Sequence, residues 1–276
     1  MKRQILIIAA AVISMTLNAC TINVDGESFG GETIKGNGNI VTRSFDVKAF
    51  DNLAVFMPFS TNYDVNFTVA DTYSCTVRLD ENLFDYLEIK VKDSELQLGK
   101  PQKQMKHKLR PTECVIEVTA PSLDEVNMAG SGRVNVLSPL DAQKMAFFVA
   151  GSGNIVFKET ANIAHLELGI AGSGDILMPA LVSDHLELNI AGSGNAKVES
   201  GTVAKAEVDI AGSGDCELAC ETEKLEANIA GSGDITARVS SQLDYSIIGS
   251  GDVSYYGNPT LKGDKLGRGG VTRLGD

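Results

Sequence analysis

The sequence has no tryptophan, only three histidines and an excess of negative charge. Tryptophan offers the largest aromatic surface for stacking on a sugar ring, so its absence argues against a polysaccharide-cleaving enzyme. The net charge of −12 at pH 7 does not suit neutralisation of phosphates, so no nucleic-acid partner is expected. Beyond residue 20, no apolar run is long enough to cross a bilayer as a helix.

The first twenty residues predict export and lipidation. Two basic residues, Lys2 and Arg3, precede an apolar stretch of signal-peptide length. The following sequence LNAC resembles the lipobox of bacterial lipoproteins, which implies removal of residues 1–19 and acylation of Cys20. An ordinary secretory signal with an unrelated cysteine is the alternative. We therefore expect an outer membrane lipoprotein of the cell envelope, held on the membrane by its N-terminal lipid. The side of the membrane that it faces is undetermined.

Composition divides the remaining chain into three predicted parts. Residues 20–39 are rich in glycine and polar side chains and predict a flexible tether. Residues 40–120 predict an N-terminal β-rich portion, because apolar and polar residues alternate in several short segments. A basic cluster at 100–110 is interpreted as a solvated loop, with a partner site as the alternative. Residues 121–276 hold the repeats and end in a glycine-rich, charged segment that predicts a C-terminal cap.

A repeat of nearly fixed period defines the C-terminal part. The tetrapeptide AGSG, or IGSG in the last clear copy, recurs at intervals of 18 to 21 residues, and a weaker copy follows at Gly267. Such periods indicate a solenoid with one coil per copy. Glycine at a corner accepts positive φ and allows neighbouring coils to approach closely. We assign this structural role to the first glycine of each clear copy, which gives Gly130, Gly151, Gly172, Gly192, Gly212, Gly231 and Gly249.

Apolar and polar residues alternate on both sides of each glycine corner. Ile190 and Leu188 precede the corner at Gly192, and Ala196 and Val198 follow it. A period of two predicts strands with one buried face, and no copy shows the 3.6-residue period of a helix. Stacked copies would bury these faces against each other. The sequence therefore predicts an all-β fold, a parallel β-helix or β-solenoid of about eight coils with about 20 residues each.

Three further segments extend the pattern to a known family. They are GNGNIVTRSFDVKAFDNLAV at 36–55, DENLFDYLEIKVKDSELQL at 80–98 and APSLDEVNMAGSGRV at 120–134. Together with the repeats, they make residues 38–276 resemble the auto-transporter adhesin head GIN domain family of exported Bacteroidetes lipoproteins. The resemblance implies a right-handed β-helical fold. It implies no established activity, and it supplies no catalytic or binding residues to transfer.

The residue three positions after each corner glycine forms a polar ladder, because equivalent positions on stacked coils lie about 5 Å apart. Asp215, Asp234 and Asp252 are three consecutive carboxylates, which could hold Ca²⁺ through their oxygens. The alternative, which we favour, is turn chemistry: Asp and Asn side chains accept hydrogen bonds from nearby backbone N–H groups. The whole ladder comprises Arg133, Asn154, Asp175, Asn195, Asp215, Asp234 and Asp252.

Three other sets of repeated residues are interpreted as structural. The serine in each tetrapeptide lacks a nearby base and a strand-to-helix elbow, so no nucleophile is predicted. His165 and His185 lie beside Glu167 and Glu187; they are interpreted as a basic stripe along an acidic one, with a zinc site as the alternative. The periodic glutamates lack the distinct acid and base that glycoside hydrolysis requires. The protein is therefore not expected to be an enzyme.

Four cysteines follow the predicted lipidation site. They are Cys75, Cys114, Cys216 and Cys220. The cell envelope permits disulfides, but the sequence alone does not choose among the pairings. Cys216 and Cys220 on one straight strand would lie about 13 Å apart, too far for a disulfide, so they are predicted to be buried thiols. Cys75–Cys114 is the better disulfide candidate.

Three functions agree with these features. The leading hypothesis is a lipid-anchored envelope protein with an adhesin-like role, which binds an unidentified glycan or protein ligand through the side of its rod. The alternative is a structural periplasmic scaffold, favoured if the last coil leaves an open strand edge. A polysaccharide-active enzyme is the third. The ligand and the oligomeric state are not specified by the sequence.

Overall fold

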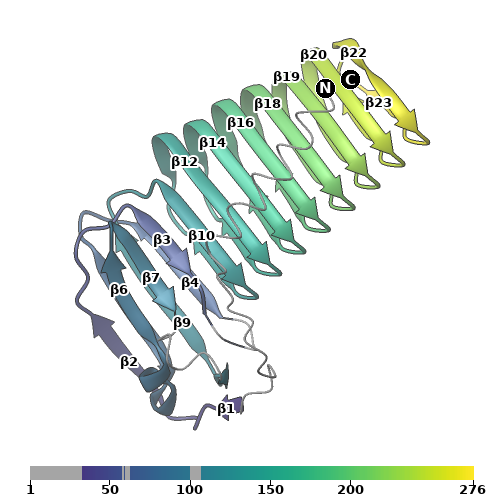
Figure 1. The fold of residues 1–276 in the computed structure, drawn as a ribbon. Coiled ribbons are helices and arrows are strands. Elements are labelled where there is room, and N and C mark those ends of the chain that lie inside the picture. Colours follow the sequence, from purple (N-terminus) through teal and green to yellow (C-terminus); the bar gives the residue numbers. More distant parts are fainter. Residues whose placement is uncertain (1–32, 58, 60–62, 100–106) are drawn as a thin grey trace.

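A computed structural model describes residues 33–57, 59, 63–99 and 107–276. The predicted signal peptide, Cys20 and most of the predicted tether lie outside these residues. The described chain consists of strands and one 3₁₀ helix, η1 (Glu81–Tyr86). None of its helices has the length and apolar character needed to cross a membrane. Figure 1 shows a long rod of stacked coils joined to a β-rich end.

Eight coils form the rod from residue 125 onward, so the predicted all-β solenoid is confirmed (Figure 1). In each coil, a long strand enters the glycine corner and a short strand leaves it. The separate long strands are β10 (Glu125–Gly130), β12 (Leu140–Gly151), β14 (Ala161–Gly172), β16 (Leu181–Gly192), β18 (Gly201–Gly212) and β22 (Thr260–Gly267). The separate short strands are β11 (Arg133–Val136), β13 (Asn154–Phe157), β15 (Asp175–Met178), β17 (Asn195–Val198), β21 (Val253–Tyr256) and β23 (Val271–Gly275). In β19 (Cys216–Gly231) and β20 (Ile235–Gly249), the short strand of one coil runs into the long strand of the next.

Neighbouring coils pair in parallel, with equivalent residues side by side. Gly172 pairs with Gly192, and Ile170 pairs with Ile190. Inward residues therefore stack into continuous apolar ladders, and burying one such side chain contributes about 1.5–3 kcal/mol. In the ladder nearest the corner, every member of the first seven coils is at most 2% exposed: Met128, Val149, Ile170, Ile190, Ile210, Ile229 and Ile247.

The corner glycines are required both by their backbone conformation and by the spacing of the coils. All seven have φ between +113° and +145°, which side chains rarely tolerate. From Gly172 onward, an added Cβ would lie within 2.3 Å of the carbonyl oxygen of the preceding corner glycine. At Gly192 this distance is 2.2 Å. The tight stacking of one corner on the next thus leaves no room for a methyl group.

The parallel stack continues into the N-terminal part in a non-sequential order. The strands of this part are β1 (Thr33–Lys35), β2 (Ile40–Phe45), β3 (Asn52–Val55), β4 (Asp64–Val69), β5 (Ser74–Asp80), β6 (Glu88–Lys92), β7 (Glu95–Gly99), β8 (Lys108–Arg110) and β9 (Cys114–Ala120). β3 and β4 form a coil against β10 and β11, and β7 and β9 form another coil beyond it. The coil that comes first in the chain is therefore second in space.

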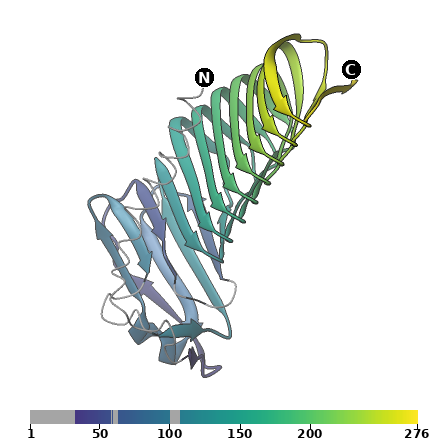
Figure 2. The same cartoon turned by 45° about the vertical axis from the view of Figure 1, so that its right-hand side comes forward.

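The two ends of the stack differ. At the N-terminal end, the antiparallel strands β6, β5 and β2 extend the sheets beyond β7 and β9. At the other end, the last coil lies at the free, yellow end of the rod in Figure 2, and no described strand pairs with the outer edges of β22 and β23. Every residue of β22 is exposed. Lys265 and Arg273 occupy positions of the last coil that face inward in the coils below. Such charges oppose the stacking of a further coil.

The predicted Cys75–Cys114 disulfide is wrong, because both thiols are free and buried. In the antiparallel pair of β5 and β9, Cys114 lies opposite Leu79. The two cysteines are therefore offset by four residues, about 13 Å along the strand, which no disulfide spans. Burial raises the pKa of both thiols to about 12. Cys216 and Cys220 are free and buried, as predicted.

Candidate functional site

The outer side of the long strands carries ladders of like residues, which we call the ladder face. The parallel register places equivalent residues of successive coils next to each other. The carboxylate ladder comprises Glu125, Glu167, Glu187, Glu207 and Glu226. The amide ladder runs beside it through Asn127, Asn189, Asp209 and Asn228. A basic ladder borders the other side of the carboxylate ladder and comprises Lys144, His165, His185, Lys205 and Lys224. An alanine ladder that begins at Ala129 borders the other side of the amide ladder.

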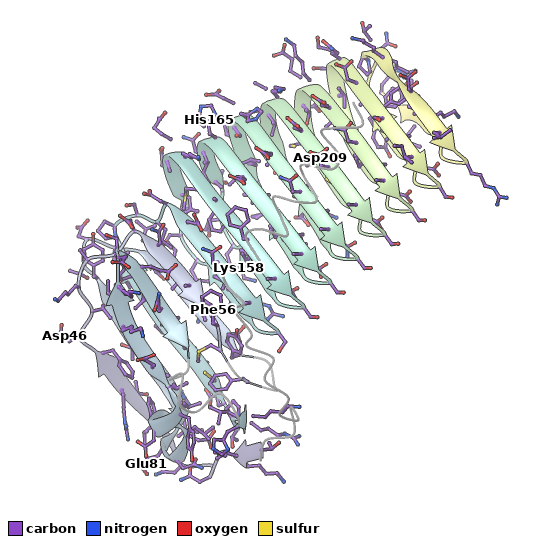
Figure 3. The ribbon with its side chains drawn as sticks, in the orientation of Figure 1. Asp46, Phe56, Glu81, Lys158, His165 and Asp209 are labelled. Atoms are coloured by element: carbon purple, nitrogen blue, oxygen red, sulfur yellow. The ribbon has the colours of Figure 1, made fainter. Side chains whose placement is uncertain are left out.

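A depression interrupts the ladder face where two small residues replace long polar ones. Ala146 stands in the carboxylate ladder, and Gly169 stands in the amide ladder. The depression has a volume of about 1060 Å³. Figure 3 labels Phe56, which lines it, and Asp209, which lies on the ladder face two coils beyond Gly169.

Phe148 forms the aromatic part of the depression. It occupies the amide ladder beside Gly169, and a Cβ added to Gly169 would lie 2.5 Å from the ring. The ring therefore occupies the space that a side chain at position 169 would take. Phe148 itself is only half-buried and lines the depression, so part of the ring stays accessible.

The free polar atoms around the depression are mainly hydrogen-bond acceptors. The Asn189 amide nitrogen donates to Glu187 Oε1 at 3.1 Å, which fixes the orientation of the amide. Asn127 likewise donates its amide N–H to Glu125. The Asn189 Oδ1 has no hydrogen-bond partner, although the residue is only 9% exposed. Among the described lining residues, the one basic side chain is Lys144.

The carboxylates of the ladder repel one another. Burial, followed by the charge of Glu187, raises the pKa of Glu167, and Lys144 lowers it. Burial and the charge of Glu226 likewise raise the pKa of Glu207. The basic ladder therefore offsets the negative charge only in part.

Asp209 is the most perturbed carboxylate of the ladder face. It is 7% exposed, and its Oδ1 has no hydrogen-bond partner. Burial raises the pKa of Asp209 to about 6; the charges of Glu207 and Glu226 add to this, while a hydrogen bond from Asn228 lowers it. The folded protein therefore holds the Asp209 proton more tightly than an unfolded chain does.

The Asp209→Asn variant is expected to raise stability at neutral pH by about 1 kcal/mol, because a neutral amide avoids the cost of burying a charge beside Glu207 and Glu226. Since the folded pKa is raised, the proton stabilises the wild type below pH 4, and this contribution is lost as the pH rises towards 6. Urea unfolding at pH 4 and pH 7 measures the effect. Asp141→Asn, at an exposed position, is the control for the charge change. Equal stabilisation by both variants would contradict the expectation.

The corner ladder of aspartates bonds one coil to the next. The backbone N–H of Asp234 donates to Asp215 Oδ1 at 2.9 Å, and that of Asp252 donates to Asp234 Oδ1 at 2.7 Å. The N–H of Gly270 donates to Asp252 Oδ1. The aspartates therefore accept backbone hydrogen bonds, as the favoured interpretation expects, and these bonds join neighbouring coils. Within the described ranges, no three His, Cys, Asp or Glu side chains are placed to hold a metal ion. Calcium binding by this ladder stays a prediction.

The Asp234→Ala variant is expected to lose about 1–2 kcal/mol of unfolding free energy, because the N–H of Asp252 loses its acceptor. Asp234→Asn keeps an oxygen in place and is expected to change stability by less than about 0.5 kcal/mol, as Asn154 and Asn195 already accept such bonds. Thermal unfolding with and without added Ca²⁺ distinguishes a hydrogen-bonding role of Asp234 from a role as a calcium ligand. A Ca²⁺-dependent stabilisation that Asp234→Asn abolishes would show a cation site instead.

His165 and His185 lie side by side in the basic ladder, with ring centroids 6.2 Å apart. Figure 3 shows His165 at the margin of the rod, away from the middle of the ladder face. The neighbouring coils carry Lys144 and Lys205 at the same position. This arrangement suits a basic stripe, and the part of the chain that the structure describes places no third ligand there for zinc.

Sequence reasoning missed the depression, although the sequence carries a signal for it. Alignment of the copies shows alanine at 146 where the others have glutamate or aspartate, and glycine at 169 where most have asparagine or aspartate. Ala146 and Gly169 interrupt the outward ladders, and Phe148, in the coil of Ala146, lies beside Gly169. These three exceptions to the repeat are the signal for the depression.

Comparisons with known proteins agree with this architecture. A crystal structure described as a "putative lipid binding protein" from Parabacteroides distasonis is 32% identical, covers 88% of this chain and 99% of its own, and gives a TM-score of 0.83. A "putative adhesin" from Parabacteroides merdae is 24% identical over 88% of this chain and 99% of its own, with a TM-score of 0.77, and shows the fold alone. No curated protein matches the sequence. Residues 49–259 match one family model, and the chain belongs to that family, described as "Putative auto-transporter adhesin, head GIN domain".

Proposed function

We propose that this protein is a lipid-anchored protein of the cell envelope that binds a glycan or protein ligand through the ladder face, without catalysis. The observation that carries the proposal is the depression at Ala146 and Gly169, which breaks an otherwise uniform surface and is lined by polar and aromatic side chains. Binding sites are typically concave and combine apolar surface with a few placed polar groups.

Two further observations support binding rather than chemistry. The family and the similar structures carry descriptions of adhesins or lipid-binding proteins, not of enzymes. The carboxylates of the ladder face are equivalent copies, whereas glycoside hydrolysis requires an acid and a base with different environments. In the proposed function, the ladder face of the rod therefore binds a ligand and carries out no reaction.

The envelope location is supported by the N-terminal sequence. Its basic start, apolar stretch and Cys20 have the order of a lipoprotein signal. A diacylated and N-acylated cysteine would hold the chain on a membrane stably, because each buried CH₂ group adds about 0.8 kcal/mol. The negative charge of the chain would keep the rod itself away from anionic lipid headgroups.

A structural scaffold is the second candidate, favoured by the open edge of β22. Leu266 on this strand is 73% exposed, and unpaired strand edges can recruit a second chain. Lys265 and Arg273, at the inward positions of the same coil, argue against end-to-end stacking. Because these two charges oppose the contact that the open edge would favour, the scaffold is the second candidate.

Protease treatment of intact cells tests the proposal, with a periplasmic protein as the control. Removal of the rod while the control survives is expected of a surface-exposed binding protein. Survival of the rod until the outer membrane is broken would remove the adhesin-like role and favour a periplasmic one. In the same cells, Cys20→Ser is expected to abolish incorporation of labelled fatty acid, and continued labelling would contradict the lipid anchor.

A further inference from the structure

We infer that the outer face of β1 and β8 docks on anionic lipid headgroups of the membrane leaflet that holds the N-terminal anchor. The inference rests on the lipid anchor of the proposed function and adds a surface through which the folded protein contacts that membrane. Three observations carry it: a group of unpaired cations, the point at which the anchored chain enters the fold, and the negative charge of the rod.

The two-stranded sheet of β1 and β8 has one exposed and one buried face. Its parallel register pairs Lys35 with Arg110 and Thr33 with Lys108, and all four residues are exposed. Leu109, between Lys108 and Arg110, points the other way and is fully buried. The outer face therefore presents three cations from two neighbouring strands: Lys35, Lys108 and Arg110.

These three cations are not neutralised by the protein itself. Among the described residues, no carboxylate forms an ion pair with any of them. Elsewhere in the N-terminal part, Arg78 pairs with Glu113 at 3.1 Å and Lys90 pairs with Glu88 at 3.0 Å. Each unpaired Lys or Arg held near an anionic bilayer strengthens the attraction about fivefold.

The helix η1 borders this sheet and brings two exposed carboxylates, Glu81 and Asp85. Asn82 of η1 donates to the Lys35 carbonyl oxygen at 2.9 Å. Because strand carbonyl groups lie in the plane of their sheet, this contact places η1 along the edge of β1 and not over its outer face. Figure 3 labels Glu81 at this end of the molecule, where its Oε2 accepts the amide of Asn39 at 2.7 Å.

The anchored chain enters the fold at the same sheet. Residues 20–32 join the predicted lipidation site to Thr33 at the start of β1, and a segment of this length spans at most about 45 Å. Just after β1, the backbone N–H of Gly38 donates to the buried carboxylate of Asp80 at 2.7 Å, which fastens the chain to the body. The anchor therefore holds the three cations close to the headgroups, at a high effective concentration.

The charge of the rod favours docking through this end. In residues 121–276, carboxylates outnumber basic side chains, so an anionic surface repels the rod. The last coil is locally basic, with Lys262 and Arg268, but Figure 1 shows it at the opposite end of the molecule from β1. Docking through β1 and β8 thus directs the rod away from the membrane, and its eight coils extend about 40 Å.

Acetylation of lysines in the tethered protein tests the docking. The chain 20–276, which keeps every described residue, is coupled through the Cys20 thiol to a maleimide lipid; the other four cysteines are buried. The vesicles consist of phosphatidylcholine alone or with about one-third phosphatidylglycerol. Mass spectrometry gives the rate at which a water-soluble reagent acetylates each lysine.

In the anionic vesicles, acetylation of Lys35 and Lys108 is expected to slow about threefold or more relative to neutral vesicles. Lys158 on the rod and Lys262 on the last coil, both exposed, are expected to keep their rates. High salt screens the attraction and is expected to restore the rates of Lys35 and Lys108. Unchanged rates of Lys35 and Lys108 would overturn the inference, and so would equal slowing of Lys158 or Lys262.

A matched pair of variants separates the docking face from total charge. Lys35→Gln/Arg110→Gln removes two of the three cations and is expected to return Lys108 to its rate in neutral vesicles. Lys158→Gln/Lys205→Gln makes the same charge change at exposed positions of the rod and is expected to leave Lys108 protected. Circular dichroism checks that both variants fold. Equal loss of protection in the two would show an effect of total charge and overturn the docking face.

Coupling in vitro makes this test independent of lipidation in cells. If Cys20 takes up fatty acid in cells but Lys35 and Lys108 react equally in both kinds of vesicle, the docking fails while the anchor stands. If both lysines are protected in anionic vesicles but Cys20 takes up no fatty acid, the anchor of the proposed function fails while the attraction of this face to anionic headgroups stands.

Discussion

The Gly192→Ala variant is expected to lose about 4 kcal/mol of unfolding free energy, an unusually large cost for one methyl group. Gly192 has φ of +134°, a conformation that alanine adopts only with strain. The added Cβ would also lie 2.2 Å from the carbonyl oxygen of Gly172. Relief of this clash requires the coils to separate, and that disturbs the apolar ladder beside the corner, including Ile170 and Ile190.

Urea unfolding followed by far-ultraviolet circular dichroism measures this loss. A stack of coils need not unfold in one step, so the slope of the transition is recorded with its midpoint. Gly38→Ala is the matched control, because Gly38 also has positive φ, +79°, but nothing lies within 4 Å of its added Cβ. Its expected cost is about 1 kcal/mol. Equal losses in the two variants would show that backbone conformation alone, and not contact between coils, sets the cost.

The Asp80→Ala variant is expected to lose about 3 kcal/mol, the second largest effect. Asp80 is fully buried at the end of β5 and accepts the backbone N–H groups of Gly38 and Thr112, each at 2.7 Å. It thereby joins the turn after β1 to the loop before β9. Removal of the carboxylate leaves two donors without an acceptor, and each such loss costs about 1–3 kcal/mol.

The pH dependence of stability distinguishes this role from simple packing. Burial alone would raise the pKa of Asp80, but the hydrogen bonds from Thr112 and Gly38 outweigh it and lower the pKa below its ordinary value of 3.8. The stabilisation is therefore present above pH 4 and is lost as the pH falls below it. Asp85→Ala, exposed in the same region, is the control. An unchanged acid limb in Asp80→Ala would contradict the assignment.

The coils were predictable because each of their determinants is local. The corner at Gly192 and the alternation around it lie within one copy, and stacking follows from repetition. The order of β3 and β7 was not predictable, because period-two alternation identifies a strand without identifying its partner. The failed disulfide has the same cause. Cys75 and Cys114 lie on neighbouring strands, but the antiparallel register, invisible in the sequence, offsets them by four residues.

On the ladder face and at the corners, repeated residues and exceptions to the repeat have different roles. The equivalent aspartates at the corners, which the sequence also suggests as calcium ligands, use their Oδ1 atoms to accept backbone N–H groups of the next coil. The depression arises where Ala146 and Gly169 depart from the repeat. In a stack of copies, the positions that repeat in every coil stabilise the fold. A position that breaks the pattern is therefore the better guide to a binding site.

The non-sequential coils at the N-terminal end have a consequence for how such a molecule can evolve. β3 and β4 are held between β7 and β9 on one side and β10 and β11 on the other, so this end tolerates no added coil without rethreading the chain. Duplication of one copy farther along would add a coil that contacts only its neighbours and lengthen the rod by about 4.8 Å. The number of copies thus sets the length of the rod, and evolution can change this length while the N-terminal part stays the same.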